Sequence, residues 1–174
     1  MRKILIVVDM QNDFVDGALG TGEAVAIVDK VAEKIAGFDG EIIATYDTHY
    51  DNYMETREGK YLPVPHCIKD TKGWQLNDKV KKALDTKKHE TIQKPTFGST
   101  ELVEKLKGCD QENTEVELIG LCTDICVVSN ALLLKANYPE LNISVDSGCC
   151  AGVTPESHQA ALTTMKMCQI NVLS

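Results

Sequence analysis

The stretch ILIVVD, residues 4–9, opens the chain with five consecutive apolar residues followed by an acid. A short, continuous run that is rich in β-branched residues is typical of a strand buried on both faces of a sheet. The next apolar residues recur at the spacing of an amphipathic helix, at Val25, Val28, Val31 and Ile35. The sequence therefore begins with a buried strand and a helix that covers it.

The alternation of strand and helix patterns continues along the chain. Further short strands are predicted at residues 42–46, 116–119, 143–146 and 170–173, with a weaker candidate at 91–94. Helical patterns lie between them, at residues 76–84, 102–106, 125–136 and 156–167. Thr154 before Pro155 is a typical N-cap and first helical position for the last of these. Strands that alternate with helices predict a single α/β domain over residues 1–174, with a parallel sheet between two layers of helices.

Composition and charge exclude several classes of protein. A chain of 174 residues with 43% hydrophobic residues can bury one full core. Its net charge of -8 offers no basic surface for nucleic acid or anionic membranes, and no stretch approaches the ~20 apolar residues of a membrane span. Asp9 interrupts the first apolar run before it reaches the length of a signal peptide, and the seven cysteines form no regular framework. These features predict a cytoplasmic protein with reduced thiols.

Three residues fall at or just past the ends of predicted strands, namely Asp9, Asp47 and Cys126. In open α/β sheets the ligand crevice lies outside the carboxyl ends of the strands. One crevice is therefore expected to collect all three side chains.

Cys126 lies where the strand at 116–119 passes through a short turn into an apolar helix. In the first turn of a helix, free backbone N–H groups and the helix dipole stabilise a thiolate, so a lowered pKa is expected for this thiol. The same N–H groups can hold an oxyanion during acyl transfer. A buried, inert thiol is the alternative, and that role is assigned to the side chains of Cys122, Cys149, Cys150 and Cys168.

Three segments carry a resemblance: VDMQNDF at 8–14, KP at 94–95 with FGS at 97–99, and GLCTDICV at 120–127. Together they resemble the isochorismatase-like cysteine hydrolases, the family that contains nicotinamidases, N-carbamoylsarcosine amidohydrolases and ureidoacrylate amidases. The resemblance covers nearly the whole chain. It implies a catalytic triad of Asp9, Lys94 and Cys126. It also implies a cis peptide between Leu121 and Cys122, and an oxyanion hole formed by the N–H groups of Cys122 and Cys126.

The chemistry of these residue types suits the hydrolysis of a small amide. An ammonium at Lys94 favours the charged forms of the thiol and of Asp9, while Asp9 can take the thiol proton and return it to departing ammonia. Attack by Cys126 then gives a tetrahedral intermediate and a thioester that water hydrolyses. Taken singly, Lys94 also fits a solvated surface lysine and Asp9 a strand-end cap.

The segment after the second strand contains possible metal ligands. Asp47 and His49 form an Asp-x-His pair, and Glu58 and His66 follow. Oxygen and imidazole ligands suit zinc, manganese or iron. Without a resemblance, such a loop also fits a solvated surface. The resemblance to nicotinamidases implies a divalent metal ion, zinc before manganese or iron, bound by Asp47, His49 and His66, with Glu58 as the fourth ligand and Glu55 as a weaker substitute.

Phe14, Leu19 and Tyr46 lie beside motif residues and are expected to line an apolar slot for a flat ring, with ordinary core packing as the alternative. The implied reaction is hydrolysis of nicotinamide to nicotinate and ammonia. Two departures from the nicotinamidase pattern weaken the substrate assignment. Thr48 stands where an aromatic residue is frequent, and the segment 62–65, Leu-Pro-Val-Pro, stands where a Trp-Pro is frequent.

Two other functions stay open. One is a metal-independent amidohydrolase of a carbamoyl or ureido compound, which would keep its activity after chelation. The other is a non-catalytic binding protein that has kept the fold. Isochorismatase activity is disfavoured because it does not use the cysteine, and a thiol-redox protein is disfavoured by the absence of a Cys-x-x-Cys motif. The resemblance also implies a homo-oligomer.

Overall fold

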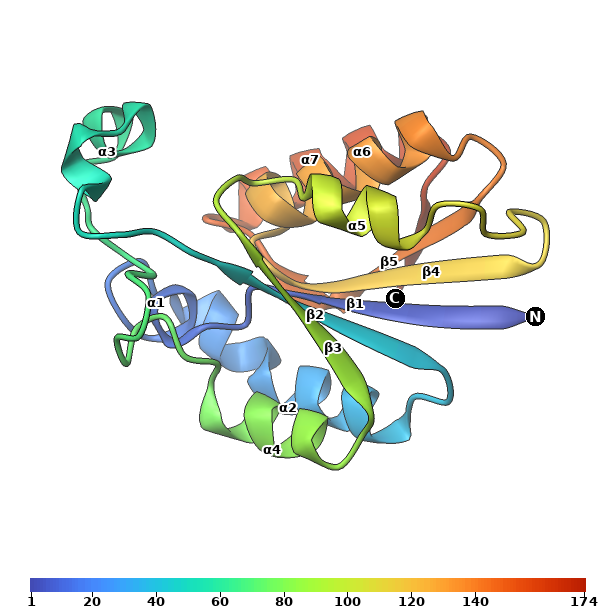
Figure 1. The fold of residues 1–174 in the computed structure, drawn as a ribbon, viewed down its shortest axis with the longest axis horizontal. Helices are drawn as coiled ribbons and strands as arrows, with labels where there is room; N and C mark the ends of the chain where they lie inside the picture. The colour runs from blue at the N-terminus through green and yellow to red at the C-terminus, as the bar shows by residue number, and fades with distance from the viewer.

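The computed structural model describes all 174 residues and contains one six-stranded sheet in which every strand runs parallel to its neighbours (Figure 1). The order of the strands across the sheet is β3-β2-β1-β4-β5-β6. Their bounds are β1 (Arg2–Val8), β2 (Glu41–Asp47), β3 (His89–Lys94), β4 (Thr114–Leu121), β5 (Asn142–Ala151) and β6 (Asn171–Leu173). The predicted parallel α/β sheet is therefore confirmed.

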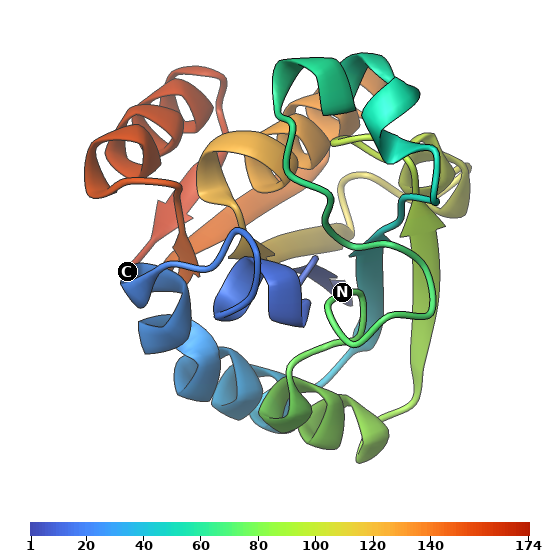
Figure 2. The same cartoon turned by 90° about the vertical axis from the view of Figure 1, so that its left-hand side faces the viewer.

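Helices cover both faces of the sheet. On one face lie α2 (Gly22–Gly37) and α4 (Asp78–Asp85), and on the other lie α5 (Thr100–Lys105), α6 (Val128–Asn137) and α7 (Pro155–Met167) (Figure 1). The short helices α1 (Asn12–Val15) and α3 (Arg57–Tyr61) lie at the end of the molecule to which the strands point, and Figure 2 looks onto this end. A 3-10 turn, Tyr53–Glu55, precedes α3, and a π-helical turn, Thr123–Val127, precedes α6.

The first strand divides the core into two halves. Residues 4–8 are all buried, as their unbroken apolar run predicts. Because side chains alternate between the faces of a strand, Ile4, Ile6 and Val8 join the core under α5, α6 and α7. Leu5 and Val7 join the core under α2 and α4. This buried central strand fixes where its last residue and the following acid lie.

Gly120 lets the end of β4 approach β1 closely. Its φ is +117°, and a Cβ atom at this position would lie 2.1 Å from the carbonyl oxygen of Val8. Only glycine adopts such a conformation at so short a distance. The turn that carries Cys126 is thereby held beside the end of β1.

The observed strands and the longer helices lie where they were predicted and differ from the predictions mainly in length. Each predicted strand is present. Thr154 caps α7 through reciprocal hydrogen bonds with Ser157, and Pro155 is the first residue of the helix. The helices α1 and α3 were not predicted, since segments of four and five residues are too short to show a periodic pattern. None of the helices has the length and apolar character needed to cross a bilayer.

Candidate active site

Lys94 links the other two residues of the predicted triad. Its Nζ lies 2.7 Å from Oδ2 of Asp9 and 3.4 Å from Sγ of Cys126. All three side chains are buried, and Lys94 and Asp9 are almost fully removed from solvent. The structure therefore brings together a thiol, an ammonium and a carboxylate from three distant parts of the sequence.

Strand register explains this assembly. Asp9 directly follows β1, Lys94 is the last residue of β3, and Cys126 follows β4 in the π-helical turn. Val8 pairs with Gly120 of β4, and Asp47 at the end of β2 pairs with Lys94. The carboxyl ends of four neighbouring strands thus meet at one edge, as predicted for a ligand crevice.

Asp9 is oriented by the neighbouring strand. Its φ is +48°, a conformation that Asp adopts more readily than most residues, and its backbone N–H donates to the carbonyl of Thr45. The Thr45 hydroxyl donates to Oδ1 of Asp9 at 2.6 Å, which leaves Oδ2 directed at Lys94. This role of Thr45 was not foreseen, although the alternation of a strand that ends at Asp47 places Thr45 and Asp47 on one face.

Burial controls the protonation of the site. It raises the pKa of the Cys126 thiol well above its usual range; the Asp9 carboxylate adds to this shift, and Lys94 opposes it. Burial also raises the pKa of Asp9, although Lys94 favours the carboxylate. The lowered pKa expected for Cys126 is therefore wrong for the resting site, because desolvation of the thiolate outweighs the helix terminus and the ammonium.

Lys94 stays charged. Burial disfavours its ammonium, but Asp9, Cys126 and Asp47 outweigh burial and raise the pKa of Lys94. Its Nζ also donates to the carbonyl of Thr96 at 3.0 Å. A solvated surface lysine, the alternative for Lys94, is excluded by its burial.

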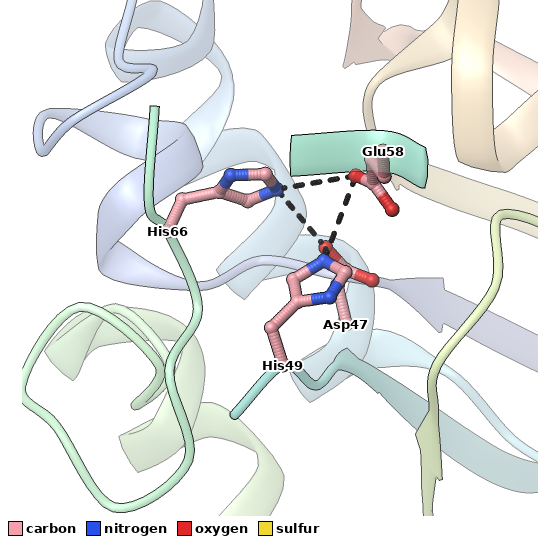
Figure 3. A group of neighbouring side chains, drawn as sticks. All are labelled: Asp47, His49, Glu58 and His66. Atoms are coloured by element: carbon pink, nitrogen blue, oxygen red, sulfur yellow. Dashed lines mark hydrogen bonds and ion pairs between the residues drawn. The ribbon is translucent and has the colours of Figure 1, made fainter. Parts of the chain in front are cut away.

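The four predicted metal ligands form one cluster (Figure 3). One ligand atom from each of Asp47, His49, Glu58 and His66 lies within 4.8 Å of the others. Asp47 Oδ2 lies 3.0 Å from Nε2 of His49 and 3.4 Å from Nε2 of His66, and Glu58 Oε1 lies 3.6 Å from both nitrogens. Glu55, the weaker candidate, is not part of this cluster.

The donor set of this cluster fits a divalent cation. Nδ1 of His66 lies 2.8 Å from the carbonyl oxygen of Val64 and donates to it, so Nε2 is left as an acceptor that faces the carboxylates. Two carboxylates and two imidazoles directed at a common point are a combination that zinc and related ions accept. Asp47, His49 and His66 are also buried. A buried carboxylate such as that of Asp47 is costly unless a cation balances its charge.

A cavity of about 360 Å³ joins the two groups of residues. Its lining contains Cys122, Cys126 and the metal-cluster residues Asp47, Glu58 and His66. Its other lining residues are Phe14, Leu19, Thr21, Tyr61, Leu62, Phe97, Ile125 and Val153. A molecule in this cavity would therefore lie beside both Cys126 and the metal cluster.

Two of the three predicted slot residues line this cavity, namely Phe14 and Leu19. Tyr46, the third, is not among the lining residues; its ring centroid lies 5.1 Å from that of Trp74, and it packs against the core, which is the alternative role. Neighbouring residues of a strand point to opposite faces, so Tyr46 cannot share the face of Thr45 and Asp47.

The predicted cis bond is present, and the other cysteines differ in burial. The peptide between Leu121 and Cys122 is cis, as the resemblance implied. Burial raises the pKa of the Cys122 thiol to about 12. Cys149 and Cys150 are buried as expected, whereas the buried role expected for Cys168 is wrong, because this residue is exposed at the end of α7; no cysteine is paired in a disulfide.

His158 has a contact that the sequence gave no reason to expect. Its Nδ1 lies 2.7 Å from the hydroxyl of Thr123, the first residue of the π-helical turn. The carboxylate of Asp124 accepts a bond from the backbone N–H of Val153. The turn that carries Cys126 is thus fastened to the loop before α7 and to α7 itself.

The whole chain is similar to proteins of one family. The family model for the isochorismatase domain matches residues 3–174. An uncharacterised isochorismatase family protein, PncA, of Bacillus subtilis is 33% identical over 94% of this chain and 93% of its own length. A nicotinamidase/pyrazinamidase of Mycobacterium tuberculosis is 29% identical over 98% of each chain.

Solved structures of similar fold include enzymes of the same kind. The crystal structure of nicotinamidase/pyrazinamidase PncA from Bacillus subtilis superposes with a TM-score of 0.87 at 26% identity and full coverage of both chains. The pyrazinamidase of Pyrococcus horikoshii in complex with zinc gives a TM-score of 0.80 at 28% identity, over 100% of this chain and 99% of that one.

Proposed function

Because the chain belongs to the isochorismatase family, we propose that it is an amidohydrolase that converts nicotinamide to nicotinate and ammonia. One observation carries the proposal. The buried contacts of Lys94 with Asp9 and Cys126 end at a cavity whose wall also holds part of the four-residue metal cluster. A nucleophile and a site for a Lewis acid therefore line the same cavity, and the base lies buried behind them, in contact with Lys94.

In the first half of the reaction, Sγ of Cys126 forms a bond to the amide carbon while Asp9 accepts the thiol proton. The raised pKa of Asp9 makes it a better base for a buried thiol. Lys94 remains an ammonium beside both groups and stabilises the negative charge that passes between them. A thiol that is neutral at rest suits this concerted transfer.

The carbonyl oxygen then carries the negative charge of the tetrahedral intermediate. We propose that the backbone N–H groups of Cys122 and Cys126 hold it, since the first N–H groups of a helix have no partners within the helix. Asp9 returns the proton to the amide nitrogen, the C–N bond breaks and ammonia leaves. The product of this half is a thioester on Cys126.

Hydrolysis of the thioester reverses the proton path. Asp9 accepts a proton from water as the water oxygen attacks the carbonyl carbon. The C–S bond then breaks, Cys126 recovers the proton, and the carboxylic acid is released. Both halves use the same three side chains.

The metal cluster supports an aromatic substrate with a ring nitrogen. Asp47, His49, Glu58 and His66 would hold a divalent ion, with zinc favoured because the related pyrazinamidase contains it. When bound, such an ion supplies a Lewis-acid position that can hold a ring nitrogen. Phe14, on the apolar wall, lies 5.5 Å from the ring of His66, so an aromatic substrate has a flat surface beside the cluster.

The protein's own side chains offer no cation to an anionic substrate in this cavity. No lysine or arginine lines it, and Lys94 behind its wall is already neutralised by Asp9. In a metal-independent enzyme, the carboxylate of ureidoacrylate or N-carbamoylsarcosine would therefore be left without a cation. The mainly apolar walls favour a neutral, flat amide instead.

An ammonia-release assay tests this function. The purified protein is given nicotinamide, pyrazinamide, ureidoacrylate and N-carbamoylsarcosine, each with and without a chelator. We expect release from the two aromatic amides and its loss after chelation. Release from a ureido or carbamoyl compound that survives chelation would instead favour the metal-independent amidohydrolase, and no release from any compound would contradict the proposal.

We also propose that the protein works in the cytoplasm and assembles as a homo-oligomer. All seven cysteines are free, which suits a reducing compartment. Oligomerisation rests on the family resemblance, and light scattering on the purified protein tests it.

A further inference from the structure

Asn130 is a polar residue that is completely buried in α6, one turn after Cys126. Its amide nitrogen donates to the carbonyl of Cys126 at 2.8 Å and to the carbonyl of Phe97 at 3.2 Å. Its amide oxygen accepts from the backbone N–H of Ser99 at 2.8 Å. Both donors and the acceptor of this side chain are therefore engaged with backbone groups.

These partners belong to the segments that carry two catalytic residues. Phe97 and Ser99 lie in the loop that follows Lys94 directly, and Lys94 itself donates to the carbonyl of Thr96 in this loop. Cys126 lies on the other side of Asn130. One side chain thus joins the backbone after Lys94 to the backbone of the nucleophile.

The loop after Lys94 is held from α6 at a second point. Gly98 packs against α6: a Cβ atom at this position would lie 3.3 Å from the carbonyl oxygen of Ser129. The side chain of Cys122, the N-cap residue of the π-helical turn, makes no hydrogen bond to that turn. Apart from Lys94 itself, whose Nζ contacts the carbonyl of Thr96 and Sγ of Cys126, Asn130 is the residue whose side chain bonds to both segments.

We propose that Asn130 is a positioning residue that sets the distance between Sγ of Cys126 and Nζ of Lys94. The inference deepens the proposed function, because it concerns the same site. The observed separation is 3.4 Å, and a buried ammonium stabilises the developing charge only while this contact is kept. Misplacement of a reacting group by about 1 Å can lower a rate on the order of 100-fold.

The test compares variants of two asparagines on one helix. Asn130→Asp keeps the shape and the acceptor but loses both donated bonds, and Asn130→Ala loses all three bonds. Asn130→Ser is a milder variant whose hydroxyl can still bond to the carbonyl of Cys126 four residues earlier. The matched control is Asn137→Asp: Asn137 donates to the carbonyl of Leu133 at 2.9 Å in the same way, but on the exposed end of α6.

Three quantities are measured on each folded variant: kcat and KM for nicotinamide, the rate at which iodoacetamide alkylates Cys126, and the melting temperature. Tandem mass spectrometry assigns the label to Cys126 among the seven cysteines. We expect kcat to fall at least tenfold in Asn130→Ala and Asn130→Asp with KM within about twofold, and alkylation of Cys126 to slow in parallel. Asn137→Asp should match the wild type in all three.

If Asn130 had a purely structural role, its variants would change the melting temperature alone. The inference is overturned if folded Asn130→Ala, or Asn130→Ser where Asn130→Ala does not fold, keeps the wild-type kcat and alkylation rate. It is also overturned if only KM changes. Alkylation needs no substrate, so this measurement still decides the role of Asn130 if the wild type releases no ammonia from nicotinamide.

Discussion

Replacing Lys94 by methionine tests whether the buried ion pair holds the site together. Methionine keeps an unbranched apolar stem, so little space is opened, but Asp9 loses the cation 2.7 Å away. Both side chains are almost inaccessible to water. Removing one partner of a buried pair costs about 3–5 kcal/mol, because the other charge stays desolvated. We expect the free energy of unfolding to fall by this amount near pH 8.

The dependence on pH gives the prediction its sign. Burial already raises the pKa of Asp9, and Lys94 works against that shift. Without Lys94 the pKa of Asp9 rises further above the value of about 3.9 found in unfolded chains. A carboxyl group with a raised pKa in the folded state does not lower the free energy of unfolding at a pH below its pKa in the unfolded chain. It lowers that free energy by the full amount at a pH above its pKa in the folded state. The loss of stability in the variant should therefore be larger at pH 8 than at pH 5.

Urea unfolding followed by fluorescence measures this effect, since Trp74 is the single tryptophan and packs against Tyr46. Lys79→Met is the matched control: Lys79 contacts Asp29 at 2.6 Å, but both side chains are largely exposed, so a change within about 0.5 kcal/mol is expected. The double variant with Asp9→Asn should regain part of the loss. A Lys94→Met protein as stable as the control variant at pH 8 would refute the reasoning.

Three further results are expected. Cys126→Ser should lose at least 1,000-fold in ammonia release while keeping the melting temperature, because a buried hydroxyl is a far weaker nucleophile than the thiol, and exposed Cys168→Ser should keep full activity. Glu58→Gln should lower zinc affinity on the order of 10-fold in a competition titration with a chelating dye, whereas Glu55→Gln, outside the cluster, should bind zinc like the wild type. Thr154→Ala should lower the free energy of unfolding by about 1 kcal/mol in urea, because the capping bonds of α7 are lost; an unchanged midpoint would contradict the capping role.

The sequence was informative where the pattern is regular. The unbroken run at 4–8 predicts a strand buried on both faces, and this fixes the place of Asp9 at the carboxyl edge. The ends of the second and fourth strands place Asp47 and Cys126 at the same edge. Strand alternation places Tyr46 on the opposite face from Asp47, in the core half that also contains Trp74.

Other features depend on tertiary contacts that no local pattern contains. Glu58 enters the metal cluster from α3, a helix of five residues that begins at a Thr56 cap and shows no periodicity. The pKa of Cys126 depends on its burial, which the position at a helix start does not reveal. The bonds of Asn130 join segments about 30 residues apart, and nothing in an apolar helical pattern indicates them.

The order of the strands explains why a long cation is needed at position 94. Neighbouring strands are spaced about 4.8 Å apart, and β2 lies between β1 and β3, so the backbones that carry Asp9 and Lys94 are separated by roughly 10 Å. The four-carbon stem of lysine covers most of this separation and the Asp9 side chain covers the rest, so a compact ammonium reaches Asp9 and Cys126 together. Thr45, on the intervening strand, supports the other oxygen of Asp9. A shorter cation such as histidine at the end of β3 would leave the carboxylate unpaired, so the parallel strand order itself selects the residue type.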